Sequence, residues 1–584
     1  MTTSEKGIYE FGPFRIDMER YLLLRDGETI PLSPKVFETL LFLIQHRGEV
    51  AKKDEILESV WPDTFVEEGN LAQNIFLLRK ALGEEKNEHR YIVTIPGVGY
   101  RFVAPVKEYE GLPPPREEVA EQPVRSIAVL PFKNLAGETA NKFFGPGLAD
   151  ALIMRLSSIR FLKVRPTAAV LKYNNLKEDP LVIGRELNVA ALLDGVYQQE
   201  ADKIRVSVQL VSVKDGITLW AAKFDENLTD IFAIQDSISE QVVRSLALQL
   251  SGDEQRQLKR NYTHDPEAFQ LFIKGRYFWN QRTPEGLRKA LDYAQQAIAI
   301  DPLYAPAYVG LADSYSLLGA QHGVLAPRES FPKARAAAER ALEIDEKLAE
   351  AYASKGFIDC VFEWDWARSE QDYLKAIELK PNYPTAHHWY GELLTILGRF
   401  DEAYRELQMA QGLDPLSLAI NVDLAASFFN SRQYDRSERQ LVNLLELNPN
   451  FIRAHTVLGR VHEQKGEYAK AIDLLDRAVE LSGADPVPLS ALAHAFASAG
   501  KMSEAGKILE DLQESANRRY VSACHIAGIY IGLGKNDLAF KWLDQAVENR
   551  DIELVWLKVN PIFDPLRSDA RFVELVRRVS PALL

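Results

Sequence analysis

The chain has 584 residues, of which 46% are hydrophobic and 26% charged, and its formal net charge is -14. This length is too great for one hydrophobic core and predicts several domains. The negative balance excludes a protein that coats nucleic acid or an anionic membrane with its whole surface, although one small module can still bind DNA through a local patch.

Cysteine usage and the N-terminus indicate where the protein works. The only two cysteines, Cys360 and Cys524, lie in separate apolar helical stretches, so they offer neither a disulfide framework nor zinc spacing. We expect buried thiols in a reducing compartment. The N-terminus lacks the apolar segment of a signal peptide, and no stretch is apolar enough to span a membrane. The sequence therefore predicts a cytoplasmic protein without membrane contact.

Residues 1–107 are expected to form one domain of short strands, three helices and a hairpin. The first helix lies in SPKVFETLLFLIQHRG, with Ser33 as its cap and Pro34 at its first position. KKDEILESVWP predicts a second helix that Pro62 stops, and EEGNLAQNIFLLRKALG a third that ends before Gly83. YIVTIPGVGYRFV then predicts two strands around a glycine turn. This order predicts a winged helix, an α+β fold.

The third helix carries the candidate DNA-binding surface. An apolar stripe on one side predicts a buried face, which leaves a polar row on the other side. The stripe consists of Leu71, Ile75, Leu78 and Leu82. The candidate DNA-binding residues are Asn70, Gln73, Asn74, Leu77, Arg79 and Lys80 of this helix, Lys53 of the second helix, and Arg90 and Arg101 beside the hairpin.

Each candidate has an expected role. Gln73 and Asn74 carry amides that can read adenine, and Leu77 can contact a thymine methyl group. Lys80 is expected to neutralise a phosphate, whereas Arg79 lies nearer the buried side and would reach round it with its long stem. The PGVG tip of the hairpin carries no basic residue that could contact DNA. The alternative is a winged helix that binds protein and has a solvated third helix.

The order of elements and the motif LRKALG followed by IVTIPGVGYRFV resemble the OmpR/PhoB class of DNA-binding domain. FGPFRIDMERYLLLRDGETIPLSPKVFETLLFL resembles that class too, including its small N-terminal sheet, so the resemblance covers residues 8–106. It implies binding to double-stranded DNA, RNA polymerase contact through Trp61 and residues 62–69, and a homo-oligomer on repeated half-sites.

Residues 108–123 are rich in proline and glutamate and predict an exposed linker. Residues 124–251 mix strands and helices and predict an α/β domain, in which VAALLDGVYQQ, KIRVSVQLVSV and GITLWAAKFD form an antiparallel meander. AVLPFKN, GLADAL, GRELNVAALLDG and ITLWAAKFD resemble the TolB-like N-terminal (FlgO-like) domain. That resemblance implies a bacterial regulator of the ToxR and CadC kind.

No catalytic or metal site is expected. The FGPG motif is too short to cradle a nucleotide and no Lys-Ser/Thr follows it. Asp150, Asp194 and Asp225 lack the spacing of a metal or acid–base pair. His387 and His388 are helical neighbours that point roughly 100° apart, so they do not readily chelate one ion. We expect no catalytic residue, no cofactor and no metal, and a nucleotide cyclase has no catalytic segment left in this chain.

The last segment, residues 262–551, carries an internal repeat. Pro381, Pro415 and Pro449 follow one another at a spacing of 34 residues, each after an apolar run. Gly391 and Gly459 fall where two helices would pack closely, and alanines follow twelve residues later. These alanines are Ala403 and Ala471, and Ala505 and Ala539 occupy the equivalent positions of later units.

This pattern resembles the tetratricopeptide family and predicts an all-α superhelix of about eight units. Residues 552–584 depart from the repeat and are expected to form a capping helix. The concave surface of such a superhelix is expected to bind a protein or peptide, and the alternative is a scaffold without a specific ligand. Together the three segments predict a multidomain, non-enzymatic, sequence-specific transcriptional regulator; the alternative is a protein-assembly adaptor.

Overall fold

A computed structural model describes residues 7–17, 22–25, 28–30, 32, 34–61, 68–84, 89–110, 126–135, 143–174, 178–200, 203–227, 231–246, 248, 250–258, 260–320 and 324–579. The chain forms two compact units, Met1–Gln122 and Pro123–Leu584. Within the ranges above, no helix is both long and apolar enough to cross a membrane.

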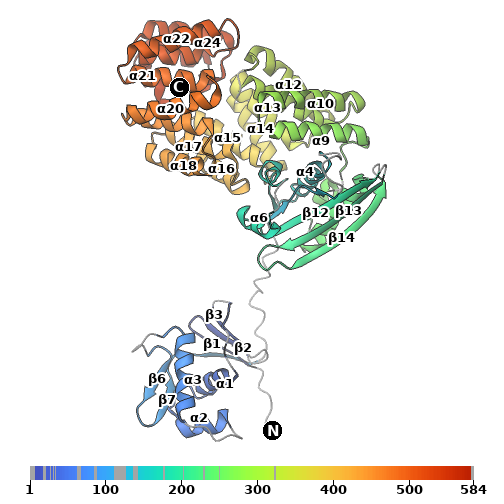
Figure 1. The fold of residues 1–584 in the computed structure, drawn as a ribbon, viewed down its shortest axis with the longest axis vertical. Helices are drawn as coiled ribbons and strands as arrows, with labels where there is room; N and C mark the ends of the chain where they lie inside the picture. The colour runs from blue at the N-terminus through green and yellow to red at the C-terminus, as the bar shows by residue number, and fades with distance from the viewer. Residues whose placement is uncertain are drawn as a thin grey trace. The chain divides into compact units, whose positions relative to one another are not determined.

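The first unit is a winged helix, as the sequence predicts. Its elements are β1 (Gly7–Phe11), β2 (Phe14–Asp17), β3 (Leu22–Arg25), β4 (Glu28–Ile30), α1 (Pro34–Gln45), β5 (Ala51–Lys52), α2 (Lys53–Val60), α3 (Glu68–Ala81), β6 (Ile92–Ile95), β7 (Gly99–Phe102) and β8 (Lys107–Glu110). One sheet has the order β4-β3-β2-β1-β8 and the other β5-β7-β6. The hairpin β6–β7 is the wing, and α3 is the third helix of the motif (Figure 1).

The buried residues of this unit explain its fold. The predicted stripe of α3, from Leu71 to Leu82, is buried together with apolar side chains of α1 and the wing. At Gly99 a Cβ atom would lie 2.0 Å from the carbonyl oxygen of Ala51, so only glycine lets β7 pair with β5 at this point.

One boundary differs from the sequence expectation. Residues 108–110 were expected in the linker, whereas β8 pairs antiparallel with β1 and extends the N-terminal sheet to Glu110. Pairing satisfies the edge hydrogen bonds of β1, which the local sequence alone does not reveal. Ser33, Pro62 and residues 111–125 lie outside the described residues.

The second unit begins with the middle α/β domain. Its elements are β9 (Ser126–Val129), β10 (Lys133–Asn134), α4 (Phe144–Leu156), β11 (Lys163–Val164), α5 (Thr167–Leu171), α6 (Pro180–Glu186), β12 (Ala191–Glu200), β13 (Lys203–Ser212), β14 (Thr218–Asn227), α7 (Ile231–Ser245) and α8 (Gly252–Leu258). The sheet order is β11-β9-β12-β13-β14, with β10 beside β12. β12, β13 and β14 form the predicted antiparallel meander.

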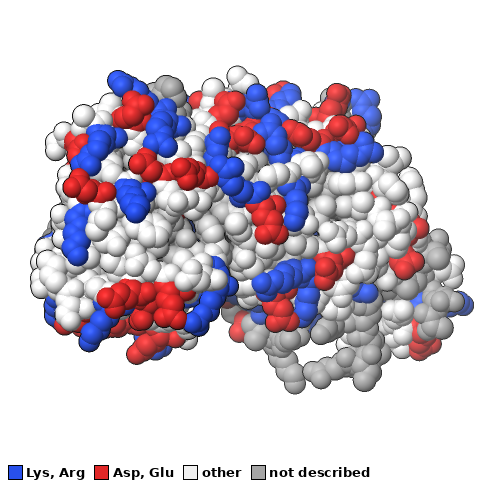
Figure 2. All heavy atoms as spheres, turned by 90° about the horizontal axis from the view of Figure 1, so that it is seen from above, with Lys and Arg blue, Asp and Glu red and all other residues white. Residues whose placement is uncertain are grey.

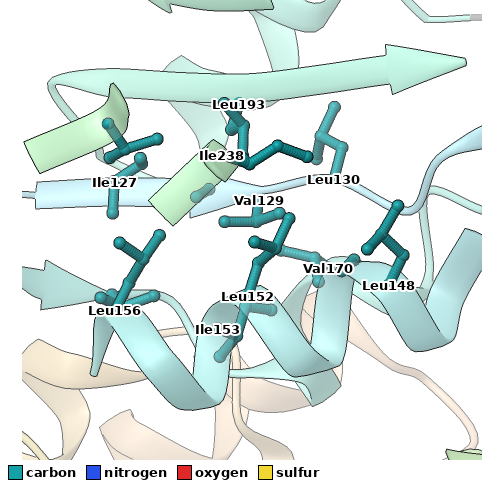
Figure 3. Packing of buried hydrophobic residues seen from close by; sticks show 14 of the residues in the cluster. Ile127, Val129, Leu130, Leu148, Leu152, Ile153, Leu156, Val170, Leu193 and Ile238 are labelled. Atoms are coloured by element: carbon teal, nitrogen blue, oxygen red, sulfur yellow. The ribbon is translucent and has the colours of Figure 1, made fainter. Parts of the chain in front are cut away.

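The core of this domain lies between the sheet and α4. Ile127 and Val129 of β9 face Leu152 and Leu156 of α4, and Ile238 of α7 joins the same cluster (Figure 3). All five side chains are buried. The near-continuous apolar run of β9 reflects this burial, because helices and neighbouring strands surround it.

The rest of the second unit is helical. Its elements are α9 (Pro266–Asn280), α10 (Pro284–Ile300), α11 (Ala305–Gly319), α12 (Pro327–Ile344), α13 (Ala349–Ile358), the π-helical turn η2 (Asp359–Glu363), α14 (Trp366–Leu379), α15 (Pro384–Ile396), α16 (Phe400–Leu413), α17 (Leu418–Asn430), α18 (Tyr434–Leu447), α19 (Ile452–Gln464), α20 (Tyr468–Ser482), α21 (Pro486–Ser498), α22 (Met502–Ser515), α23 (Ala523–Gly532) and α24 (Asn536–Asn549). Consecutive helices pack in pairs, and the pairs stack (Figure 1).

The small residues of the repeat act as the sequence predicts. A Cβ atom at Gly391 would lie 2.6 Å from Leu407, and at Gly459 it would lie 2.6 Å from Leu475. The alanines twelve residues later, Ala403, Ala471 and their equivalents, are fully buried. Side chains of this size let the two helices of a pair approach closely.

The end of the tail departs from a single capping helix. It consists of two 3-10 turns, η3 (Ile552–Trp556) and η4 (Pro561–Leu566), followed by α25 (Ala570–Val579). Pro561 opens η4 and Pro565 lies inside it, and prolines of this spacing interrupt an α-helix. Phe572, Leu575 and Val576 of α25 are buried against the tail.

The middle domain packs directly on the tail. A Cβ atom at Gly147 of α4 would lie 2.1 Å from Ile273 of α9, so the glycines of FGPG serve close packing. The buried Arg165 donates to the carbonyl oxygens of Leu187 and Asn188 in the middle domain. It also donates to the carbonyl oxygens of residues 412 and 413 in the tail. The second unit is therefore one packed body.

Candidate nucleic-acid interface

The exposed side of α3 is the candidate DNA-reading surface. Asn70, Gln73, Leu77 and Lys80 are exposed, as the apolar stripe on the opposite side predicts. They recur at a helical spacing that places them on one face. A helix with such a face fits the dimensions of the major groove.

Asn74 lies on the other side of this helix, contrary to its expected role in base reading. It is 9% exposed, and its Nδ2 donates to the carbonyl oxygen of Lys35 at 3.1 Å and to Oγ1 of Thr39 at 3.0 Å. Thr39 in turn donates to the carbonyl oxygen of Lys35. Because both donors of the amide are used inside the domain, Asn74 joins α3 to α1 instead of facing a base.

Arg79 reaches the wing. Its Nη2 donates to the carbonyl oxygen of Ile92 at 3.0 Å and to Oγ1 of Thr94 at 2.9 Å, both in β6. Its Nε lies 3.6 Å from Glu84, whose other carboxylate oxygen accepts the amide of Ile92. Arg79 therefore holds the wing against α3. The sequence predicts instead that its side chain contacts a DNA phosphate.

The remaining basic candidates surround this surface. Lys53 is the first residue of α2, and its amide donates to the carbonyl oxygen of Val98 at the wing tip at 3.2 Å. Arg90 is exposed just before β6. Arg101 in β7 is half-buried, and its Nε has no hydrogen-bond partner among the described residues. Val98 at the tip is 44% exposed.

Phe76 is a surface residue that the sequence analysis missed. It is 61% exposed and lies on α3 between Gln73 and Lys80, beside Leu77 at 37% exposure. A large aromatic side chain is usually assigned to a core, yet its helical position relative to Gln73 already places it on the outer face. The candidate reading surface thus has an apolar centre with polar neighbours.

Family comparisons assign the same regions. Residues 27–102 match the model for the C-terminal domain of transcriptional regulatory proteins. Residues 123–241 match the second domain of HilA/YgeH-like transcriptional regulators, whereas the sequence motifs had suggested a TolB-like domain. Residues 372–405 and 422–486 match tetratricopeptide models.

Individual relatives agree with these matches. The transcriptional regulator HilA of Salmonella typhimurium is 26% identical over 419 residues, covering 71% of this chain and 72% of HilA. The transcriptional activator CadC of Escherichia coli K12 is 22% identical over 369 residues, covering 50% of this chain and 71% of CadC. A Rhizobium meliloti protein named as an adenylate cyclase is 31% identical, but over only 32% of each chain.

The chain combines an OmpR/PhoB-type winged-helix domain with a tetratricopeptide tail and is similar to bacterial transcriptional regulators. It is a DNA-binding protein, and its relatives HilA and CadC are transcriptional regulators as well. The adaptor alternative is not favoured, because the relatives HilA and CadC are transcriptional regulators.

The tail of this regulator contains a large cavity. The cavity has a volume of about 1370 Å³ and follows the first helices of successive repeats from α9 to α21, reaching α4 and α5 of the middle domain. Charged side chains of both signs line it. Arg276 of α9 binds the buried Asp150 of α4 through two 3.1 Å bonds, and Lys380 donates to Glu350 at 2.8 Å.

The two neighbouring histidines of α15 have different partners. His387 lies 2.6 Å from Glu406 and 2.8 Å from the carbonyl oxygen of Pro381. His388 lies 2.9 Å from Asp423, and together with Glu392 these residues place possible metal ligands within 4.8 Å of one another. Their immediate surroundings include a cation of the protein itself.

That cation is Arg453 of α19, whose Nη2 lies 2.5 Å from Asp423. Burial and the nearby Asp423 carboxylate raise the pKa of Glu392 to about 7. Burial lowers the pKa of His388, but its hydrogen bond to Asp423 and the charges of Glu392 and Asp423 together raise it on balance. The group is an ionic network that joins α15, α17 and α19.

The three aspartates of the middle domain have separate surroundings. Asp150 accepts hydrogen bonds from Thr167 and Arg276. Asp194 on β12 has a buried Oδ1 without a partner among the described residues. Asp225 on β14 pairs with Arg205 of β13 at the surface. Asp150 therefore holds the domain to the tail.

Proposed function

We propose that this regulator places α3 in the major groove of promoter DNA and reads bases with Asn70, Gln73 and Leu77. The observation that carries the proposal is an exposed row on a helix whose opposite side is fixed. The buried stripe, the Asn74 bonds to α1 and the Arg79 bonds to the wing hold that helix in one orientation. Recognition improves when the reading side chains stand on a rigid element.

Phe76 belongs to this proposed surface. Its exposed ring lies between Gln73 and the basic Lys80. An apolar tip in the major groove contacts the methyl group of thymine, and a glutamine amide bonds to adenine. Phe76 and Gln73 together support a preference for a DNA site rich in A·T base pairs.

The basic residues are proposed to position the domain on the DNA backbone. Lys80 lies at the exposed end of α3, Lys53 starts α2 beside the wing tip, and Arg90 and Arg101 flank the wing. Contacts to phosphate set the register of a DNA-binding protein without reading sequence. Arg79 acts on the wing and is proposed as a positioning residue.

The second unit is proposed to act through proteins and without enzymatic chemistry, in the cytoplasm. On the face shown in Figure 2, lysines and arginines are interspersed with acidic residues, and wide areas carry neither. Mixed charge suits protein contacts better than phosphate backbones. We infer a protein or peptide partner for the tail, a homo-oligomer on DNA and contact with RNA polymerase.

The experiment that tests the DNA contacts uses the full chain. Bound sequences are selected from fragmented genomic DNA, and affinity is then measured against salt for Gln73→Ala and Lys80→Ala. Gln73→Ala should relax discrimination at one base by about 1–3 kcal/mol. Lys80→Ala should weaken all sequences alike and reduce the salt slope by about one.

Two results would contradict this assignment. If both variants bind as tightly and as selectively as the unmodified chain, α3 is not the reading helix. If the full chain enriches no sequence even at low salt, the winged helix binds protein, and the adaptor becomes the better proposal.

A further inference from the structure

In seven repeats, the turn between the two helices contains a residue in the left-handed conformation. This residue is Gly398, Gly466, Gly500 or Gly534 in four repeats and Arg282, Trp364 or Arg432 in three others. Glycine adopts a positive φ freely, whereas a side chain strains the backbone there. A residue other than glycine at this turn therefore calls for a compensating use of its side chain.

Two of the three exceptions have such a use within the protein. Arg432 donates to both carboxylate oxygens of Asp564, at 2.7 and 2.9 Å, and to the carbonyl oxygen of Asn430. Trp364 is 7% exposed and belongs to the core of the tail. Protein contacts thus explain both side chains.

Arg282 is different. Its guanidinium lies 3.6 Å from the centre of the Trp279 ring, but it forms no hydrogen bond or ion pair with any residue that the structure describes. The residue is exposed to solvent and lines the cavity of the tail. Its guanidinium is charged at neutral pH, as arginine is throughout proteins.

The charged neighbours Arg276 and Asp313 have hydrogen-bond partners of their own. Arg276 also faces the Trp279 ring, at 5.5 Å, but Asp150 satisfies its guanidinium. Asp313 attracts Arg282 electrostatically, while its Oδ1 accepts a hydrogen bond from Ser354 at 2.5 Å. The Nε1 of Trp279, a side chain only 9% exposed, is buried and has no hydrogen-bond partner in the described part of the chain. Among the described residues, none accepts a hydrogen bond from the Arg282 guanidinium or from the Trp279 ring nitrogen.

We propose that Arg282, held against Trp279, binds an oxyanion, a carboxylate or phosphate group, that enters the cavity of the tail. The planar guanidinium presents N–H donors in a fork that matches two oxygens of such a group. Stacking on Trp279 fixes the plane of the fork before the ligand arrives. The strained backbone of Arg282 is retained because the side chain serves this ligand. The proposal rests on the proposed ligand-binding role of the tail and not on the DNA contacts.

Titration calorimetry of the full chain tests the site with three probes: citrate, inorganic phosphate and a penta-aspartate peptide. At least one probe should bind at a single site, and Arg282→Gly should weaken it by about tenfold or more. Binding of citrate or phosphate identifies a free small ligand. Binding of the peptide alone identifies a segment of a protein as the source of the oxyanion.

Two further variants separate binding from folding. Glycine relieves the left-handed strain at position 282, so Arg282→Gly should keep or raise the melting temperature while it loses the ligand. Arg282→Lys keeps the charge but not the fork and should retain part of the affinity. The matched control is Arg550→Gly, because Arg550 also has a positive φ and lies 4.2 Å over Trp364, yet donates to the carbonyl oxygen of Phe362.

Arg550 is not among the residues that line the cavity, so its variant should bind the probes as the unmodified chain does. The proposal is overturned if none of the three probes binds, or if Arg282→Gly binds them unchanged. DNA affinity of each variant is measured in parallel. Arg282 has no proposed part in DNA reading. If no oxyanion binds at Arg282, the proposed DNA contacts still stand, and if those contacts are wrong, the oxyanion site still stands.

Discussion

The side chains of α3 have two roles: some are proposed to read DNA bases, and others hold the helix in the domain. Gln73 and Phe76 point outward. The adjacent Asn74 points into the domain, and its amide group donates two hydrogen bonds to α1. A change of one position along a helix turns a side chain by roughly 100° and reverses its role. Residues of the same chemical type therefore act differently on this helix.

Replacing Asn74 tests its support role. Asn74→Ala removes two buried hydrogen bonds and should destabilise the winged helix by about 1–3 kcal/mol. Hydrogen exchange of α3 in the full chain, followed by mass spectrometry, measures this loss as faster exchange. Gln73→Ala is the matched control, because an exposed neighbour should change stability by less than about 0.5 kcal/mol. Equal exchange in both variants would show that Asn74 does not support α3.

At the scale of elements, charged networks link the helices that line the cavity. His388 and Glu392 of α15 lie beside Asp423 of α17, which Arg453 of α19 also binds. Glu392 carries the proton more readily in the folded chain than in the unfolded chain, since its pKa is raised to about 7. His388 also has a raised pKa. Because both pKa values are raised by folding, protonation of Glu392 and His388 stabilises the folded chain relative to the unfolded chain.

This network predicts the sign of a pH effect. The folded chain binds the Glu392 proton above the usual pKa of the unfolded carboxyl, so the associated stability is lost as pH rises toward and through about 7. The raised pKa of His388 adds a loss above its usual range. Glu392→Gln should reduce the fall in melting temperature between about pH 5.5 and pH 8 by roughly 2–4 °C.

Differential scanning calorimetry of the full chain measures this difference. The control is Glu378→Gln, because Glu378 is exposed and pairs with Lys375 at the surface of α14. If Glu378→Gln reduces the pH dependence of the melting temperature as much as Glu392→Gln does, the network is not its cause.

For the whole molecule, the decisive contact joins the middle domain to the tail. The buried Arg165 donates to carbonyl oxygens in both parts, and Nδ2 of Asn382 in the tail donates to the carbonyl oxygen of Arg160 in the middle domain at 2.6 Å. Buried bonds from a charged donor are stronger than neutral ones. The middle domain is therefore expected to unfold together with the repeats that it contacts and to transmit ligand binding in the cavity.

Arg165→Ala tests this coupling. Loss of several buried bonds should destabilise the second unit by about 3 kcal/mol and separate the melting of the middle domain from that of the tail. Calorimetry of the full chain would show an added or broadened transition. Arg205→Ala, which removes a surface pair with Asp225 inside the middle sheet, should leave the profile unchanged. A single unshifted transition in Arg165→Ala would show that the two parts are not coupled through this residue.

The sequence by itself determined the winged helix, the meander and the repeat tail. These depend on local patterns: the stripe from Leu71 to Leu82, the alternation in β12 to β14, and glycines and alanines at a fixed period. Periodicity fixes which side of an element is buried because burial has a period of its own in helices and strands.

Only the tertiary structure decided which groups meet. Three contacts join residues that are distant in the sequence: Asn74 bonds to α1, Arg79 bonds to the wing, and β8 pairs with β1. The cavity and the unpaired Arg282 within it arise in the same way, from repeats stacked on one another and on the middle domain. A local pattern states that a side chain is buried or exposed, whereas its partners depend on packing across the whole unit.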